Sequence, residues 1–176
     1  HDVMVDDPEG LTRLLLEAGA DPNDGESVYH ATEHGDLACL RLLLEHGGRP
    51  DAANALKHML DRESADGVRM LLYAWVNPEL VNAEGDTALH WAVRRGRSPA
   101  IVGMLLEAGA DIDAVRGDGR TAYAMARISG QTAVAELLAG RGCDTRLSAI
   151  DAFAAGEDSE VPVQSALSPA NARLLT

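Results

Sequence analysis

The sequence is poor in aromatic residues and has no strand-like runs, and both shortages narrow the fold. Aromatics make up only 3% of the 176 residues although 46% are apolar, so Leu, Ala and Val must build the interior. Ala and Leu are the residues that favour helices most. Alternating runs of Val, Ile and Thr are missing, which argues against an extensive sheet. The length suits one folded unit, and we therefore expect a single all-α domain.

Cysteine and positive charge are also scarce. Cys39 and Cys143 are the only cysteines, which is no disulfide framework for this length and favours a reducing, cytoplasmic location. A formal net charge of −13 would repel a phosphate backbone or an anionic membrane surface, so neither is expected as a partner. No apolar run approaches the roughly 18 residues that span a membrane, and no secretion signal is visible. The start at His1 rather than Met suggests an excised piece, and leaves a lost targeting segment open.

The sequence does contain one segment that occurs five times. Its versions are LLLEAGADPN, LLLEHGGRPD, MLLYAWVNPE, MLLEAGADID and ELLAGRGCDT. Their anchor positions Gly19, Gly47, Trp75, Gly109 and Gly142 are separated by 28, 28, 34 and 33 residues. Spacing of this order is typical of a solenoid, in which one supersecondary unit stacks on copies of itself.

Each unit is predicted to contain a short helix, a tight turn, a second helix and an extended finger loop. In the best-formed copy, Thr87 can cap the first helix, Gly96 turns the chain, and Gly109 closes the second helix in a left-handed conformation. Apolar residues at helical spacing predict the buried stripe of this copy: Leu89, Ala92, Val93, Ile101, Val102, Leu105 and Leu106.

The stretch GDTALHWAVRRG, followed by IVGMLLEAGADIDA, resembles the ankyrin repeat, whose signature includes T-P-L-H-x-A at a period of about 33 residues. The resemblance covers residues 7–148 and implies an ankyrin-repeat solenoid of stacked antiparallel helix pairs, with roughly four central repeats and partial terminal units. The predicted units are 1–24 (a partial N-terminal unit), 25–52, 53–82, 83–116 and 117–148, followed by C-terminal capping helices over 149–176.

The third copy departs most from the family pattern. Lys57 replaces the motif His, Glu63 replaces the turn Gly, and Trp75 replaces the capping Gly. Either Trp75 adopts the left-handed closing conformation or its helix ends differently. The first two finger loops are shorter than the later ones, so the deepest part of the inner groove is expected at the fingers 76–86 and 110–120.

The stretch YHATEH places His30, Glu33 and His34 at the H-x-x-E-H spacing of a zinc peptidase. The two histidines can share a helical face. No other segment offers an evident third ligand, however, and a solenoid has an open groove rather than a cleft that excludes water. We therefore expect exposed polar groups here, no metal, no cofactor and no catalytic residue anywhere in the chain.

Three further residues receive structural interpretations. The resemblance implies that His90 bridges neighbouring units through the backbone. Cys39 falls on the apolar stripe of the second copy and is expected to be a small core residue. Cys143 lies more than three repeats away, so the two cysteines cannot pair within one extended monomer.

The resemblance also implies a function, because ankyrin arrays are non-catalytic modules that hold a protein partner with their finger tips and inner helices. Carried over to this sequence, the candidate contact residues are Glu33, His34, Asp61, Arg62, Glu84, Asp86, Trp91, Arg94, Arg95, Asp118, Arg120, Ile128 and Ser129. The chain is expected to be a monomer.

An arginine cluster (Arg94, Arg95, Arg97, Arg116, Arg120 and Arg127) sharpens this expectation. Arginine suits carboxylate capture and is enriched at binding hot spots, so the cluster predicts a basic surface beside Trp91 for an acidic segment of the partner. The alternative is that the arginines are solvated or pair with Glu107, Asp111 and Asp118. Other functional classes stay open: a regulatory or localising arm of a larger enzyme or effector, a structural unit that self-associates through its ends and, last, a metallopeptidase.

Overall fold

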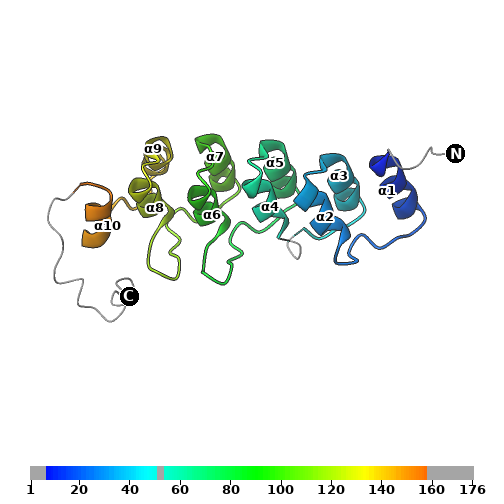
Figure 1. Ribbon diagram of the computed structural model, residues 1–176, viewed down its shortest axis with the longest axis horizontal. Coiled ribbons are helices and arrows are strands. Elements are labelled where there is room, and N and C mark those ends of the chain that lie inside the picture. The colour runs from blue at the N-terminus through cyan, green and yellow to red at the C-terminus, as the bar shows by residue number, and fades with distance from the viewer. Residues whose placement is uncertain (1–6, 51–53, 158–176) are drawn as a thin grey trace.

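The computed structural model describes residues 7–50 and 54–157, which form ten helices and no named strand (Figure 1). This confirms the all-α prediction. The helices are α1 (Pro8–Glu17), α2 (Ser27–His34), α3 (Leu37–Glu45), α4 (Ala55–Asp61), α5 (Ala65–Tyr73), α6 (Ala88–Arg94), α7 (Pro99–Glu107), α8 (Ala122–Ile128), α9 (Thr132–Gly140) and α10 (Ala149–Ala154).

The helices stand in two rows, as a solenoid of helix pairs requires. The inner row contains α2, α4, α6, α8 and α10, and the finger loops hang from its side of the molecule (Figure 1). The outer row contains α1, α3, α5, α7 and α9. Within the described part of the chain, α1 packs on α3 and has no inner-row helix as a partner. In residues 7–18 the structure therefore describes one outer-row helix.

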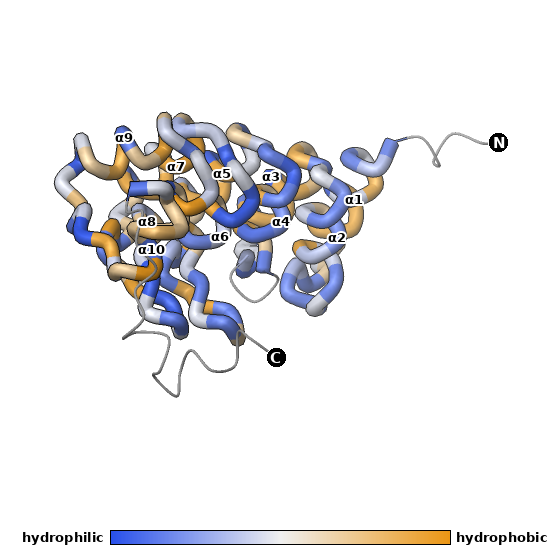
Figure 2. Tube along the Cα trace, turned by 60° about the vertical axis from the view of Figure 1, so that its left-hand side comes forward, coloured by the Kyte–Doolittle hydropathy of each residue, from blue (hydrophilic) through white to orange (hydrophobic). Residues whose placement is uncertain are grey.

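The core lies between the two rows, where the hydrophobic segments in Figure 2 gather, while the finger loops are mostly hydrophilic. The predicted stripe of the best-formed copy is buried, except that Leu106 is only partly covered. Cys39 is buried in the same core, as expected. The largest fully buried apolar side chains are Leu40, Met59, Leu60, Leu71, Leu89, Ile101, Leu105 and Leu138.

Helix ends follow the predicted turn chemistry. The Thr87 hydroxyl accepts a long hydrogen bond of 3.5 Å from the backbone N–H of His90, at the start of α6. Gly109 takes a left-handed φ of 92° after α7. The N–H of Gly109 then donates to Leu106 and the N–H of Ala110 to Leu105, both at 3.0 Å. These bonds occupy carbonyls that the helix end would otherwise leave unpaired.

Trp75 adopts the left-handed closing conformation, the first of the two helix endings that the sequence allows. Its φ is 60°, and its N–H donates to Leu72 at 3.1 Å while Val76 donates to Leu71 at 3.2 Å, so α5 ends as the glycine copies do. Glu63 takes a φ of 54° at the inter-helix turn of the same repeat. Left-handed backbone costs a non-glycine residue about 1 to 2 kcal/mol. The third repeat therefore keeps the fold at a local energetic cost.

One further short helix follows the last predicted repeat. The Ser148 hydroxyl accepts a hydrogen bond of 3.1 Å from Asp151 and starts α10, which packs on α8. Ile150 is partly buried, and Phe153 stays 42% exposed. The rest of the capping helices predicted over 149–176, after residue 157, lies outside the described residues. Among the helices that are described, none is both long and apolar enough to cross a membrane.

Candidate functional site

The inner face of the solenoid is formed by the inner-row helices and the two long fingers, 76–86 and 110–120. The fingers touch, because the N–H of Gly117 donates to the carbonyl of Glu84 at 3.4 Å. Val115 and Thr121 pair across the second finger as an antiparallel bridge. A cleft runs between α4 and α6 beside the first finger, where Leu80 and Val81 expose apolar surface.

Trp91, on α6, stands at the edge of this cleft and collects charged groups from two helices. Its Nε1–H donates to Asp61 at 2.8 Å, and Asp61 also pairs with Arg95 Nε at 2.8 Å. The Lys57 ammonium lies 4.2 Å from the ring centroid, and the guanidinium carbons of Arg95 and Arg94 lie at 4.7 Å and 5.6 Å. Such cation–π contacts stabilise by about 0.5–1 kcal/mol each at exposed sites. We call these five residues the Trp91 platform.

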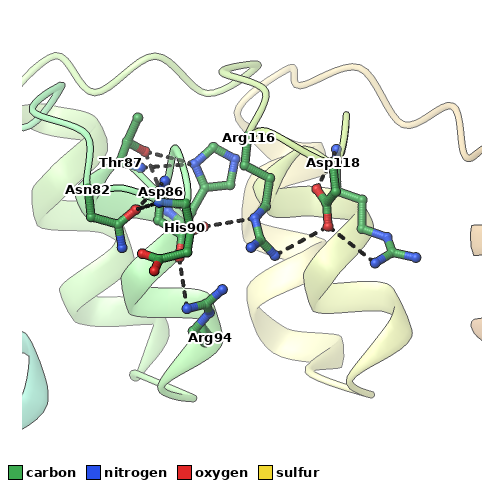
Figure 3. Close-up of polar contacts among 9 residues, drawn as sticks. Asn82, Asp86, Thr87, His90, Arg94, Arg116 and Asp118 are labelled. Carbon is green, nitrogen blue, oxygen red and sulfur yellow. Dashed lines mark hydrogen bonds and ion pairs between the residues drawn. The ribbon is translucent and has the colours of Figure 1, made fainter. Parts of the chain in front are cut away.

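Asp86 is buried, which corrects the expectation of an exposed contact residue at this position. It is only 3% exposed, and its carboxylate reaches Arg94 Nη1 at 3.1 Å and Arg116 Nε at 2.8 Å (Figure 3). Its backbone N–H donates to Asn82 at 2.8 Å. Since Asp86 directly precedes the cap Thr87, the position is fixed by the start of α6. Asp86 therefore ties this helix to the next finger.

His90 is fully buried one turn into α6 (Figure 3). Its Nδ1 lies 3.0 Å from the Thr87 hydroxyl and accepts from the Thr87 N–H at 3.3 Å. Burial lowers the pKa of His90, against the opposite effects of Asp86 and of backbone groups in the next finger, at Arg120 and Ala114. The residue is thus a structural histidine placed against the neighbouring unit. Among the described residues its Nε2 has no hydrogen-bond partner, so the backbone bridge that the resemblance implies stays a prediction.

The arginine cluster is balanced by carboxylates. Each of its six members makes an ion pair: Arg94 with Asp86, Arg95 with Asp61, Arg97 with Glu63, Arg116 with Asp86 and Asp118, Arg120 with Asp118 and Asp151, and Arg127 with Glu157. Of the three partners expected from the sequence, Asp118 is used, whereas Glu107 pairs with Arg141. A partner's carboxylates would have to compete with these pairs.

The other predicted contact residues all keep exposed surface. Asp61, Arg62 and His34 lie at the ends of inner helices, with Glu33 half-buried beside them. Glu84 and Asp118 are exposed at the finger tips and Arg120 is half-buried, while Ile128 and Ser129 lie at the end of α8. Lys57 is the one residue of the Trp91 platform that the sequence did not predict as a contact residue; there it is only a departure from the repeat motif. The signal for it is the repeat period, which places residues of successive inner helices side by side.

Two rows of short antiparallel helices, with fingers on the inner side, define an α-solenoid of the repeat class. Residues 56–149 match the family model for ankyrin repeats in three copies, and the chain belongs to the ankyrin repeat family. This confirms the resemblance and the solenoid that it implied. Ankyrin repeats are generally protein–protein interaction modules and typically non-catalytic.

Two solved structures support the same assignment. An ankyrin repeat domain from Acinetobacter baumannii is 34% identical, with a TM-score of 0.67 over 74% of each chain. The ankyrin repeat domain of Bcl-3, described as a unique member of the IkappaB protein family, is 27% identical, with a TM-score of 0.70 over 80% of this chain and 68% of that one. No curated protein sequence matches the chain.

Proposed function

We propose that this chain binds a protein partner through its inner face, with the Trp91 platform at the centre of the contact. The observation that carries the proposal is a half-buried indole between two inner helices, surrounded by Lys57, Arg94 and Arg95 and adjoining a cleft. Tryptophan and arginine are the residues most enriched at binding hot spots. Leu80 and Val81 add exposed apolar surface at the rim.

The partner segment is proposed to combine an apolar side chain with acidic groups. The apolar group would cover the Trp91 ring and the cleft beside it. Among the described residues, Lys57 makes no ion pair, and Arg95 keeps about half of its side chain exposed. These two cations are therefore the best placed to receive carboxylates, whereas Arg116 is held by buried Asp86.

The remaining parts of the proposal concern the setting of the module. It acts as a monomer in the cytoplasm, where its two unpaired, buried thiols stay reduced. The same inner face would serve a free-standing module or a regulatory or localising arm of a larger enzyme. Glu33, His34, Asp61, Arg62, Glu84, Asp118, Arg120, Ile128 and Ser129 would form the periphery of the contact.

Charge reversal tests the acidic segment. Once a partner is identified, titration calorimetry should show that Arg95→Glu weakens binding at least 10-fold at low salt, with a smaller difference at high salt because exposed charges are screened. Trp91→Ala should weaken binding by a similar factor at every salt concentration. If Arg95→Glu and Lys57→Glu leave the affinity unchanged, the acidic segment is wrong. If Trp91→Ala also leaves it unchanged, the whole platform is wrong.

A further inference from the structure

The helix α2 carries a side-chain cluster whose convergence is not explained by the peripheral role proposed for Glu33 and His34 in partner binding. His30, Glu33 and His34 each offer a ligand atom, and these atoms lie within 4.8 Å of one another. His30 Nδ1 lies 3.4 Å from Glu33 Oε2, and His34 Nε2 lies 4.0 Å from the same oxygen. Positions three and four apart share one helical face, so the backbone itself holds the three groups together.

We propose that His30, Glu33 and His34 form a binding site for a divalent transition-metal ion such as Zn²⁺. Imidazole nitrogen and carboxylate oxygen bind zinc at about 2.0–2.2 Å, which places tetrahedral donors about 3.4 Å apart. The separation between His30 and Glu33 already has this value. The His34–Glu33 separation of 4.0 Å must close by about 0.6 Å, and the two histidine donors, which lie within 4.8 Å, by at most about 1.4 Å. Exposed side chains achieve this by small torsional changes.

The residues around the cluster orient the ligands. The Tyr29 hydroxyl donates to Glu33 Oε1 at 3.1 Å, and this leaves Oε2 to face the two histidines. Glu26 Oε2 lies 3.3 Å from His30 Nε2, on the far side of the ring from Glu33. A carboxylate behind a ligating histidine fixes the ring and raises its basicity at metal sites. Both supports come from the same short stretch of chain.

The surroundings explain why the site is open to the ion. His30 and His34 line a cleft of about 410 Å³ between α1 and α2. This side of α2 is reachable because, in the described part of the chain, α1 brings no inner-row helix to cover it. Two imidazoles favour Zn²⁺ or a similar ion over Mg²⁺ and Ca²⁺, which prefer oxygen ligands alone.

The proposed metal site gives Glu33 a role that the sequence did not predict. The sequence offered no third ligand from another segment, but Glu33 serves as that ligand from within the same helix, rather than as a catalytic base. The cluster does not support peptidase chemistry, because His34 is 72% exposed and no described residue around the cluster excludes water. The open coordination positions would hold water.

Calorimetry of the full chain with Zn²⁺ alone tests the site. We expect one ion per chain, with an affinity that falls at least 10-fold in His30→Ala and in His34→Ala, and by a similar factor in Glu33→Gln. Tyr29→Phe, which removes only the orienting hydroxyl, should weaken binding several-fold. His46→Ala and His1→Ala remove histidines outside the cluster and should leave the affinity unchanged.

Circular dichroism of each variant keeps the result interpretable, because a variant that retains the helical spectrum has lost only ligands. No uptake below about 1 mM Zn²⁺ overturns the proposal, as does uptake that His34→Ala leaves intact or that His1→Ala abolishes. An affinity that Glu33→Gln does not change overturns the three-ligand site. Partner binding through the Trp91 platform does not depend on any of these outcomes.

Discussion

Replacing Asp86 with Asn should destabilise the array much more than replacing any exposed carboxylate. The substitution keeps the size of the side chain and removes the charge that faces Arg94 and Arg116. Breaking a buried ion pair costs about 3–5 kcal/mol. Both arginines retain solvent access, at 35% and 15% of the side chain, and Arg116 keeps Asp118 at 3.4 Å. We therefore expect a loss of about 2 kcal/mol in the free energy of unfolding.

Urea and thermal denaturation followed by circular dichroism measure this loss. For a chain of this length, about 2 kcal/mol corresponds to a fall in Tm of about 4–8 °C. Asp118→Asn is the matched control, because it pairs with Arg116 and Arg120 at the surface, where such pairs stabilise by about 0–1 kcal/mol. A loss below about 0.5 kcal/mol for Asp86→Asn, or equal losses in both variants, would refute the buried tie between α6 and the next finger.

Two further predictions follow from the backbone and from burial. Trp75→Gly should raise the free energy of unfolding, measured by urea denaturation, by about 0.5–1 kcal/mol. Glycine takes the left-handed φ of 60° without strain, and the indole that is lost is 91% exposed. A destabilised variant would show that the indole itself contributes to stability. Burial lowers the pKa of His90 below its ordinary 6.5, so the unfolded chain binds the extra proton first. The contribution of His90 to stability is then fully present above pH 6.5 and falls on acidification, by at most about 1.4 kcal/mol per pH unit for one proton. The free energy of unfolding from urea curves should therefore change less between pH 7 and pH 5 in His90→Gln than in the unaltered chain. Equal changes in the two proteins would contradict this assignment.

The repeat register could be predicted because glycine and leucine recur in phase. Gly109 has the left-handed conformation that its place in the repeat predicts. Trp75 adopts the same conformation at the equivalent position, although non-glycine residues disfavour it. Because each unit packs on its neighbours, the repeat register extends through this copy as well. The sequence alone could not decide between the two possible endings of the helix at Trp75. Both endings are compatible with the preceding helix, and only packing selects between them.

Only some of the ion pairs, such as those of Asp118, could be predicted by looking along the chain. From the sequence, the carboxylates expected to pair with the arginines are Glu107, Asp111 and Asp118. In the structure, Arg97 pairs with Glu63 and Arg141 with Glu107, each pair 34 residues apart. One repeat period therefore separates the partners, because stacking places equivalent positions of successive units side by side. The repeat spacing contains this information, although the local sequence does not.

The burial of Asp86 was missed for the same reason. Its place at the tip of a finger is an exposed contact position in the family pattern, and nothing near it in the sequence indicates otherwise. Arg116, which comes from the following finger, closes over it. The metal-binding cluster shows the opposite case, because its spacing was visible in the sequence and only the rotamers showed that the three ligand atoms converge.

Quantitative capture from the source lysate with two matched variants tests the central claim most directly, namely that the inner face binds a protein. One variant, Trp91→Ala with Arg95→Glu, alters the inner face, and the other, Tyr73→Ser, removes a side chain that is 78% exposed on the outer row. We predict that at least one protein is captured equally by the unaltered chain and by the outer-face variant, and that the inner-face variant does not capture it. Equal retention by all three, or loss only with Tyr73→Ser, would contradict the account.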